Sequence, residues 1–241
     1  MRAALARLRR GARRLGPLGL SALVLVAAVA GVAAWQVSRR PAAGGGAGSS
    51  VVRVGVSQGE SIPSYLVAAA TELGTVPDNT DMYALVSLRD YHEPDGLAEI
   101  LAGVAITAVY ARVPLAGQQP QIVQIPANRL PQDVTAGMDE VARRKDHEAA
   151  GYADDSVGRS LRELARAEAT AYRQHCACVY AAVVRGRRAA LATLARRDAV
   201  RVVDPAPDVT RLDRAVWLPP LPEQSEQATP PGTASSTPGS R

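Results

Sequence analysis

The sequence predicts one α/β domain, or one of the related α+β class, that follows a single N-terminal transmembrane helix. Three observations lead to this prediction. An uncharged apolar run occupies residues 15–37, segments with strand and helix periodicity alternate over 51–222, and both ends of the chain lack such periodicity. Without the ends, roughly 170 residues remain to fold, which is the size of one ordinary domain.

The uncharged run at 15–37 is long enough to cross a membrane as a helix. At ~1.5 Å rise per residue it spans a ~30 Å hydrocarbon core. Six arginines and no acid precede it, whereas only Arg39 and Arg40 follow it closely. The positive-inside rule therefore places residues 1–14 in the cytoplasm and the rest of the chain outside the cell membrane. A cleaved signal peptide is the alternative, because residues 28–30 form an A-x-A match.

The segments on either side of the domain have the composition of unfolded chain. Residues 38–50 are rich in Gly, Ser and Ala, which predicts a flexible linker. Residues 223–241 are rich in Pro, Ser and Thr and cannot bury enough apolar surface to offset the entropy of ordering, which predicts a disordered tail. The chain has no Phe and one lysine, Lys145, a composition typical of a GC-rich bacterial genome.

A first group of strands and helices fills the N-terminal part of the domain. Alternating apolar residues predict the strands, and helical spacing predicts the helices. In chain order these are a strand at 51–56, a helix at 61–73, a strand at 83–91, a helix at 93–103 and a strand at 104–113. Ser61 is a suitable N-cap for the first helix, and Gly103 closes the second. A further strand at 121–125 lies between two prolines, which predicts an edge position.

The order of strand, helix and strand recurs at 178–186, 187–197 and 199–203. Two such βαβ-like units predict the two halves of one α/β sandwich. Between them, apolar residues at helical spacing predict an inserted helical hairpin at 132–174. The hairpin either covers the sheet or forms an exposed arm that binds a partner protein.

The positive net charge of the chain does not indicate nucleic-acid binding. Eight of the 28 Lys and Arg residues flank the membrane segment, so the region after residue 40 carries 20 basic and 23 acidic residues. Its net charge is therefore about −3, whereas phosphate binding requires a basic face on the folded domain. The sequence predicts no nucleic-acid partner.

One short motif suggests catalysis. Gly55, Ser57 and Gly59 match G-x-S-x-G between a predicted strand and a predicted helix. The match resembles the nucleophile elbow of the α/β-hydrolases, which implies Ser57 as a catalytic nucleophile. The alternative is a glycine-rich turn without a catalytic role, because the strand is the first of the domain and His92 follows by only 35 positions.

Two acidic stretches that contain histidine do not predict a metal site. In residues 90–96, Asp95 follows Pro94 where a helix is expected to start, and a carboxylate there caps the helix. In residues 146–148, neighbouring side chains of a helix diverge by about 100°. No P-loop follows a glycine-rich stretch. We therefore predict neither a metal nor a cofactor.

The stretch His175-Cys176-Ala177-Cys178 contains both cysteines of the chain. In a strand the two cysteines share one face and His175 points to the other, whereas in a helix Cys176 turns away from Cys178. Neither geometry directs all three side chains to one metal. Buried free thiols are one interpretation. A Cys176–Cys178 disulfide is the other, although strand Cα atoms about 6.5 Å apart are near the limit of disulfide geometry.

These features favour a single-pass membrane protein of the bacterial cell envelope rather than an enzyme. Its extracytoplasmic domain is expected to act by binding, as a structural or regulatory component of an envelope assembly. A membrane-tethered serine hydrolase that uses Ser57 is the alternative.

Overall fold

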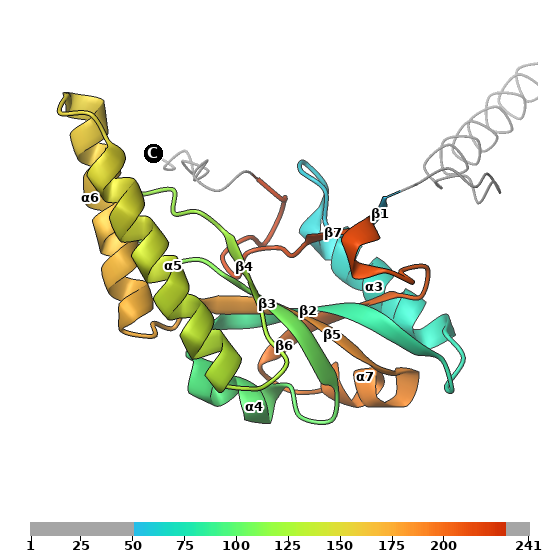
Figure 1. Ribbon diagram of the computed structural model, residues 1–241. Helices are drawn as coiled ribbons and strands as arrows, with labels where there is room; N and C mark the ends of the chain where they lie inside the picture. The colour runs from blue at the N-terminus through green and yellow to red at the C-terminus, as the bar shows by residue number, and fades with distance from the viewer. Residues whose placement is uncertain (1–50, 230–241) are drawn as a thin grey trace, which may run out of the picture. The chain divides into compact units, whose positions relative to one another are not determined.

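A five-stranded antiparallel sheet lies at the centre of the structure (Figure 1). The computed structural model describes residues 51–229, whose mixed α/β fold contains two sheets and five helices. The predicted membrane segment at 15–37, the predicted linker at 38–50 and residues 230–241 lie outside the described residues. Within residues 51–229, none of the helices combines the length and the apolar character needed to cross a membrane.

The strands of the large sheet come from both predicted units. Their order across the sheet is β4-β3-β5-β2-β6. In chain order they are β2 (Asp81–His92), β3 (Ala105–Ala111), β4 (Val123–Pro126), β5 (Val179–Arg187) and β6 (Val200–Ala206). β4 is an edge strand, as the prolines around it predicted.

Two βαβ units interlock in this sheet. β5 lies between β2 and β3 and is antiparallel to both, and β2 lies in the same way between β5 and β6. The strands of the first unit, β2 and β3, are therefore parallel and separated by β5. The strands of the second unit, β5 and β6, are parallel and separated by β2, which is the ferredoxin-like arrangement. The crossover helices are α4 (Leu97–Ile100), which follows the short 3-10 helix η2 (Pro94–Gly96), and α7 (Arg188–Leu194). Figure 1 shows α4 and α7 on the same side of the sheet.

The two faces of the large sheet have separate apolar cores. On one face, valines of β2, β3 and β5 pack with leucines of α4 and α7. On the other face, Leu85 and Tyr180 pack with Trp217. Trp217 lies in β7 (Ala215–Leu218), which pairs in parallel with β1 (Val52–Gly55) to form the second sheet. Both faces are thus covered, one by helices and one by a two-stranded sheet.

Helix α3 (Ile62–Thr75) starts where the sequence predicted. The hydroxyl of Ser61 accepts a hydrogen bond from the backbone N–H of Ser64, which satisfies one donor of the first turn. The helix packs along β6, where Tyr65 donates a hydrogen bond to Asp204. It therefore closes the β6 edge of the large sheet.

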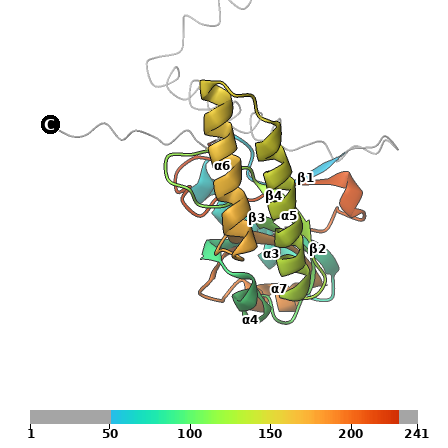
Figure 2. The same cartoon turned by 60° about the vertical axis from the view of Figure 1, so that its left-hand side comes forward.

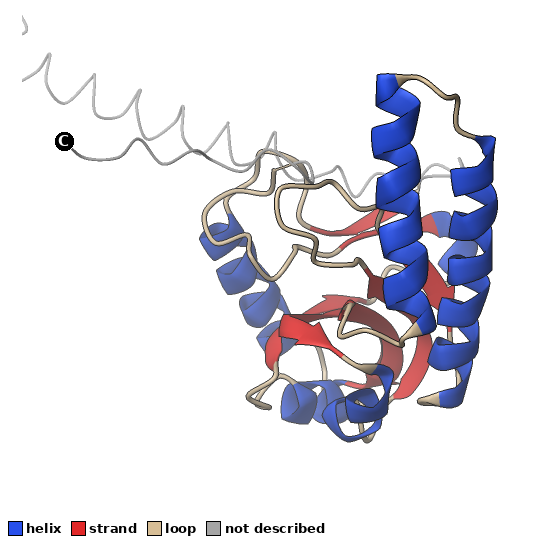
Figure 3. Cartoon of the chain, turned by 90° about the vertical axis from the view of Figure 1, so that its left-hand side faces the viewer, coloured by secondary structure: helices blue, strands red, loops and turns tan. Residues whose placement is uncertain are grey.

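The predicted hairpin consists of α5 (Gln132–Gly151) and α6 (Ser156–Arg173). The first part of α5 buries Val134 and Met138 in the core beside β4. Gly137 permits this approach, since a Cβ there would lie 2.2 Å from Cγ2 of Ile125. Figures 2 and 3 show the two helices side by side, with their connected ends projecting beyond the rest of the domain. The hairpin thus covers the sheet at its base and forms an arm at its tip.

The segment before Trp217 carries Val209, Leu212 and Val216 near helical spacing. Nevertheless only a 3-10 turn, η3 (Leu212–Arg214), forms before β7 begins. The strand is stabilised by β1, which comes from the other end of the domain. A long-range partner therefore decided the structure of this segment.

Residues 219–229, which we call the C-terminal strap, follow β7, and Leu221 of the strap packs in the same apolar core as Trp217. The guanidinium group of Arg201 donates hydrogen bonds to the backbone carbonyls of Leu221, Pro222 and Gln224. Glu223 forms an ion pair with Arg112. Residues 223–229, predicted to belong to the disordered tail, are thus held by arginines of β6 and of the segment after β3.

Candidate functional site

In residues 51–229, no hydrogen bond joins the Ser57 hydroxyl to a side chain that could act as a general base. Gly55 has a φ of 109°, and a Cβ at this position would lie 2.2 Å from the carbonyl oxygen of Leu218. The glycine therefore allows the close approach of β1 and β7. The backbone N–H of Ser57 donates to the Glu60 carboxylate at 2.8 Å, but no hydrogen bond joins the Ser57 hydroxyl to a histidine within residues 51–229. β1 is also outside the large sheet, whereas a nucleophile elbow needs a central strand.

The three histidines lie apart in the fold. His92 ends β2, and its Nε2 is buried without a hydrogen-bond partner in the described part of the chain. His147 is exposed on α5, while Nε2 of His175 lies 3.1 Å from a carboxylate oxygen of Asp139. Across residues 51–229, no three His, Cys, Asp or Glu side chains are grouped closely enough to hold a metal ion.

Cys176 and Cys178 are joined by a disulfide in the structure, the second of the two arrangements considered above. Their Cα atoms are 5.3 Å apart, within the usual range for a disulfide. This distance is shorter than in a strand because the cysteines lie in the turn between α6 and β5, where His175 adopts a φ of 51°. The disulfide closes this turn and leaves no thiolate for catalysis.

A buried carboxylate that the sequence analysis did not single out lies in β6. The side chain of Asp204 accepts a hydrogen bond from the Tyr65 hydroxyl at 3.1 Å, and the residue is 8 % exposed. The pKa of Asp204 is raised to about 6, mainly by burial; the nearby Glu72 adds to the rise, and the hydrogen bond from Tyr65 opposes it. A cavity of about 250 Å³ beside it is also lined by Asp208. The residues that line this cavity include no Ser, Thr, Cys or Lys, and the Asp204 carboxylate holds α3 against β6 through Tyr65.

Asp204 should make the stability of the domain depend on pH. Its folded-state pKa of about 6 lies above the ordinary value of 3.8, so the folded state binds the proton more tightly than the unfolded state. The stabilisation that protonated Asp204 gives the folded state is complete below pH ~4. It is lost as the pH rises through ~6, which lowers the free energy of unfolding by about 3 kcal/mol. Urea unfolding at several pH values should show this loss in the natural chain and not in Asp204→Asn. Parallel pH profiles for the two proteins would contradict the assignment.

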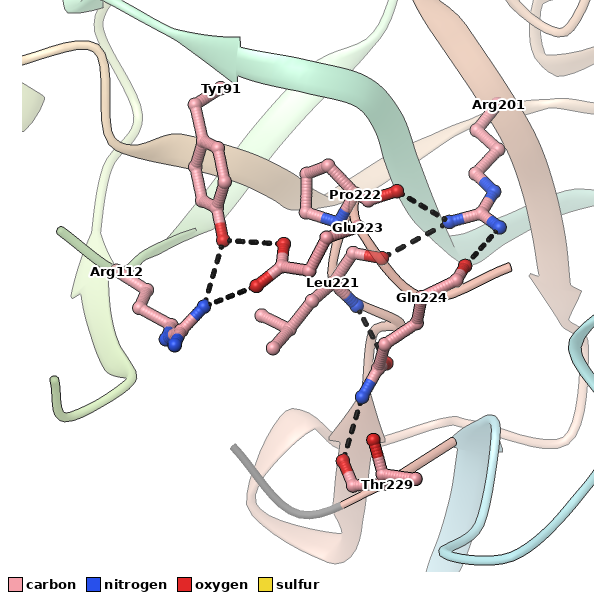
Figure 4. Close-up of polar contacts among 8 residues, drawn as sticks. All are labelled: Tyr91, Arg112, Arg201, Leu221, Pro222, Glu223, Gln224 and Thr229. Atoms are coloured by element: carbon pink, nitrogen blue, oxygen red, sulfur yellow. Dashed lines mark hydrogen bonds and ion pairs between the residues drawn. The ribbon is translucent and has the colours of Figure 1, made fainter. Parts of the chain in front are cut away.

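A polar cluster around the buried Arg112 joins the large sheet to the C-terminal strap (Figure 4). Nη1 of Arg112, a residue that is 6 % exposed, donates to the hydroxyl of Tyr91 and to the carboxylate of Glu223. The Tyr91 hydroxyl donates to the other carboxylate oxygen of Glu223 at 3.0 Å. The ring of Tyr180 packs edge to face on Tyr91, with centroids 5.8 Å apart. Because Glu223 of the strap pairs with Arg112, this cluster binds the strap to the sheet.

The interior of the hairpin carries a second buried polar cluster. Nζ of Lys145 lies 2.9 Å from Glu168 and 3.0 Å from Glu148, and the side chains of Lys145 and Glu168 are 3 % and 2 % exposed. Glu168 also accepts a hydrogen bond from the backbone N–H of Gln121, in the loop before β4. These contacts join α5 to α6 and join the hairpin to the sheet domain.

The tip of the hairpin is well connected but leaves apolar side chains in solvent. The guanidinium group of Arg162 donates to the backbone carbonyls of Tyr152 and Ala153, and the carboxylate of Asp155 caps α6 through the N–H of Gly158. Val157 and Leu161, one turn apart on α6, are nevertheless 66 % and 40 % exposed. The tip is therefore an ordered surface with unburied apolar side chains.

Among the described residues, the structure contains a buried carboxylate that joins α3 to β6, a polar cluster that holds the C-terminal strap, and an exposed hairpin tip. In the same residues, neither Ser57 nor a free cysteine lies beside a general base. Comparison with known proteins adds no relative: no family model, curated protein or solved structure matches the chain.

Proposed function

We propose that the chain is a single-pass protein of the bacterial cell membrane, and that its extracytoplasmic domain binds a protein partner through the tip of the α5–α6 hairpin. The partner is expected to be a component of a cell-envelope assembly. The observation that carries the proposal is the exposure of Val157 and Leu161 on an ordered, projecting tip.

Two physical arguments support this function. Neighbouring apolar side chains in water are unfavourable by about 25 cal/mol per Å² until they are covered, and such patches mark interaction sites. The side chains of Val157 and Leu161 lie four residues apart on one helix face, which suits an apolar groove on a partner. The buried contacts of Lys145 and Arg162 keep the arm in one conformation, so little entropy is lost on binding.

Site-specific photo-crosslinking tests the hairpin. A photoreactive phenylalanine analogue would replace Val157 or Leu161 in the full chain, expressed in the native host. The control places the analogue at Val67 of α3, which is 68 % exposed. We expect one adduct of the same mass from positions 157 and 161 and no such adduct from 67. Leu161→Asp should abolish the adduct from 157. Identical adducts from all three positions, or none from the tip, would disprove the hairpin as the binding surface.

A fusion experiment tests the proposed orientation. A reporter attached after residue 241 should be active only outside the cytoplasm, because the arginines before residue 15 keep the N-terminus inside. The chain should also remain in the membrane after washing with high salt. Release of a soluble protein that begins at Gly31 would show instead that the N-terminal run is a cleaved signal peptide.

A further inference from the structure

Strand β7 has a free edge. In its parallel pairing with β1, the backbone N–H of Val56 donates to the carbonyl of Leu218, so Leu218 and Val216 direct their backbone groups toward β1. Ala215 and Trp217 therefore direct theirs to the opposite side. The N–H of Ala215 is bonded to the carbonyl of Leu212. Within residues 51–229, β7 pairs with β1 alone, and no turn or loop hydrogen bond reaches the backbone N–H or C=O of Trp217.

Two cavities adjoin β7: Ala215 and Val216, which precede Trp217, line the first, and Leu218, which follows it, lines the second. The first, of about 430 Å³, lies between β7 and the face of β3 and β4, and Ala108 and Val183 line it. The second, of about 410 Å³, is lined by Ile122 and by residues of the C-terminal strap. Trp217 and Tyr110 line both cavities, and no charged side chain lines either. Tyr180 lines the second cavity, and its buried hydroxyl has no partner in the described part of the chain.

We infer that the free edge of β7 binds an extended peptide of another protein, which adds as a strand and places an uncharged side chain in each cavity beside Trp217. An extended backbone supplies both the acceptor and the donor that Trp217 lacks. Alternate side chains of a strand point to one face, about 7 Å apart, and so reach both cavities. A charged side chain is excluded because it would be desolvated without a partner. The Tyr180 hydroxyl favours a peptide with threonine as well as valine or isoleucine.

The chain's own C-terminal residues are a poor occupant. Residues 230–241 follow Thr229, which lines the second cavity, so they are within reach. They contain no Val, Ile, Leu, Met or aromatic residue to fill an apolar cavity, and three of the twelve are prolines, which lack a backbone N–H. A segment from another protein is therefore the better match, and this site is independent of the hairpin tip.

The test uses the full chain in detergent micelles and a fluorescent heptapeptide of alternating threonine and valine. The control peptide has proline in place of the central valine. We expect the first peptide to raise the fluorescence anisotropy on binding and to slow hydrogen exchange of the Trp217 amide at least tenfold, and the control to bind at least tenfold more weakly. Ala108→Leu, which fills the first cavity from β3, should weaken binding similarly, whereas Val67→Thr on α3 should not.

Three results would overturn the inference: equal binding of the two peptides, no binding, or binding without slower exchange at Trp217. If a chain ending at Thr229 binds the peptide more than tenfold tighter than the full chain, the occupant is the chain's own C-terminus and the assignment to another protein is wrong.

Discussion

Replacing Lys145 with methionine is expected to lower the free energy of unfolding by about 3–5 kcal/mol. The substitution removes the cation that lies 2.9 Å from Glu168, whose side chain is only 2 % exposed. Glu168 then keeps a buried charge with the backbone N–H of Gln121 as its remaining donor in the described structure. Breaking one side of a buried ion pair is costly because the other charge stays out of water. Urea unfolding followed by circular dichroism measures the loss.

Two further variants separate this effect from a general weakness of the hairpin. Arg143→Met removes an ion pair with Glu140 on the exposed face of α5 and should cost less than about 0.5 kcal/mol. The double variant Lys145→Met with Glu168→Met should recover most of the stability, since an apolar pair of similar volume replaces both charges. If Lys145→Met costs no more than Arg143→Met, the buried pair does not hold the hairpin together.

Replacing Gly55 with alanine is expected to lower the free energy of unfolding by about 3 kcal/mol or more. The φ of 109° is unfavourable for any residue with a Cβ, and the new Cβ would lie 2.2 Å from the carbonyl oxygen of Leu218. β1 and β7 must then separate, and the packing of Trp217 is lost with them. Gly59→Ala, with a φ of 81° but open space around it, should cost only about 1 kcal/mol. Thermal unfolding of the two variants gives the comparison.

Substitution of Ser57 tests the hydrolase alternative. Ser57→Ala should change the stability by less than about 0.5 kcal/mol, because the contact of Ser57 with Glu60 uses its backbone N–H. We expect no labelling of the chain by a fluorophosphonate probe. Labelling that disappears in Ser57→Ala would show that Ser57 is an active nucleophile and that the G-x-S-x-G match has a catalytic role.

Local periodicity predicted most of the regular elements. The apolar alternation at 83–91 and 104–113 corresponds to β2 and β3, and the hairpin helices lie within the predicted 132–174. Prolines around 121–125 predicted the edge position of β4. These predictions succeeded because each rests on neighbouring residues, whose spacing decides which face is apolar.

The candidate sites were harder to predict, because their residues meet only in the fold. Asp204 follows an apolar run, but its raised pKa depends first on burial in the fold and then on Glu72 of α3, which comes from a distant part of the chain. The ion pair of Arg112 with Glu223 likewise joins residues 111 positions apart. An acid in an apolar strand and a glutamate in a proline-rich segment were the only local signals.

The sequence by itself determined most of the element types, the hairpin and the glycine-rich turn at 55–59, since these depend on side-chain periodicity and on the freedom of glycine. Only the tertiary structure decided how the two βαβ units interleave, that 215–218 is a strand, and that residues 223–229 are bound. It also decided that Cys176 and Cys178 pair, because the end of α6 turns the chain before β5 begins. The interleaving of the units, the strand at 215–218 and the binding of residues 223–229 each need a partner from far along the chain, and loop closure between distant residues leaves no periodic signal in the local sequence.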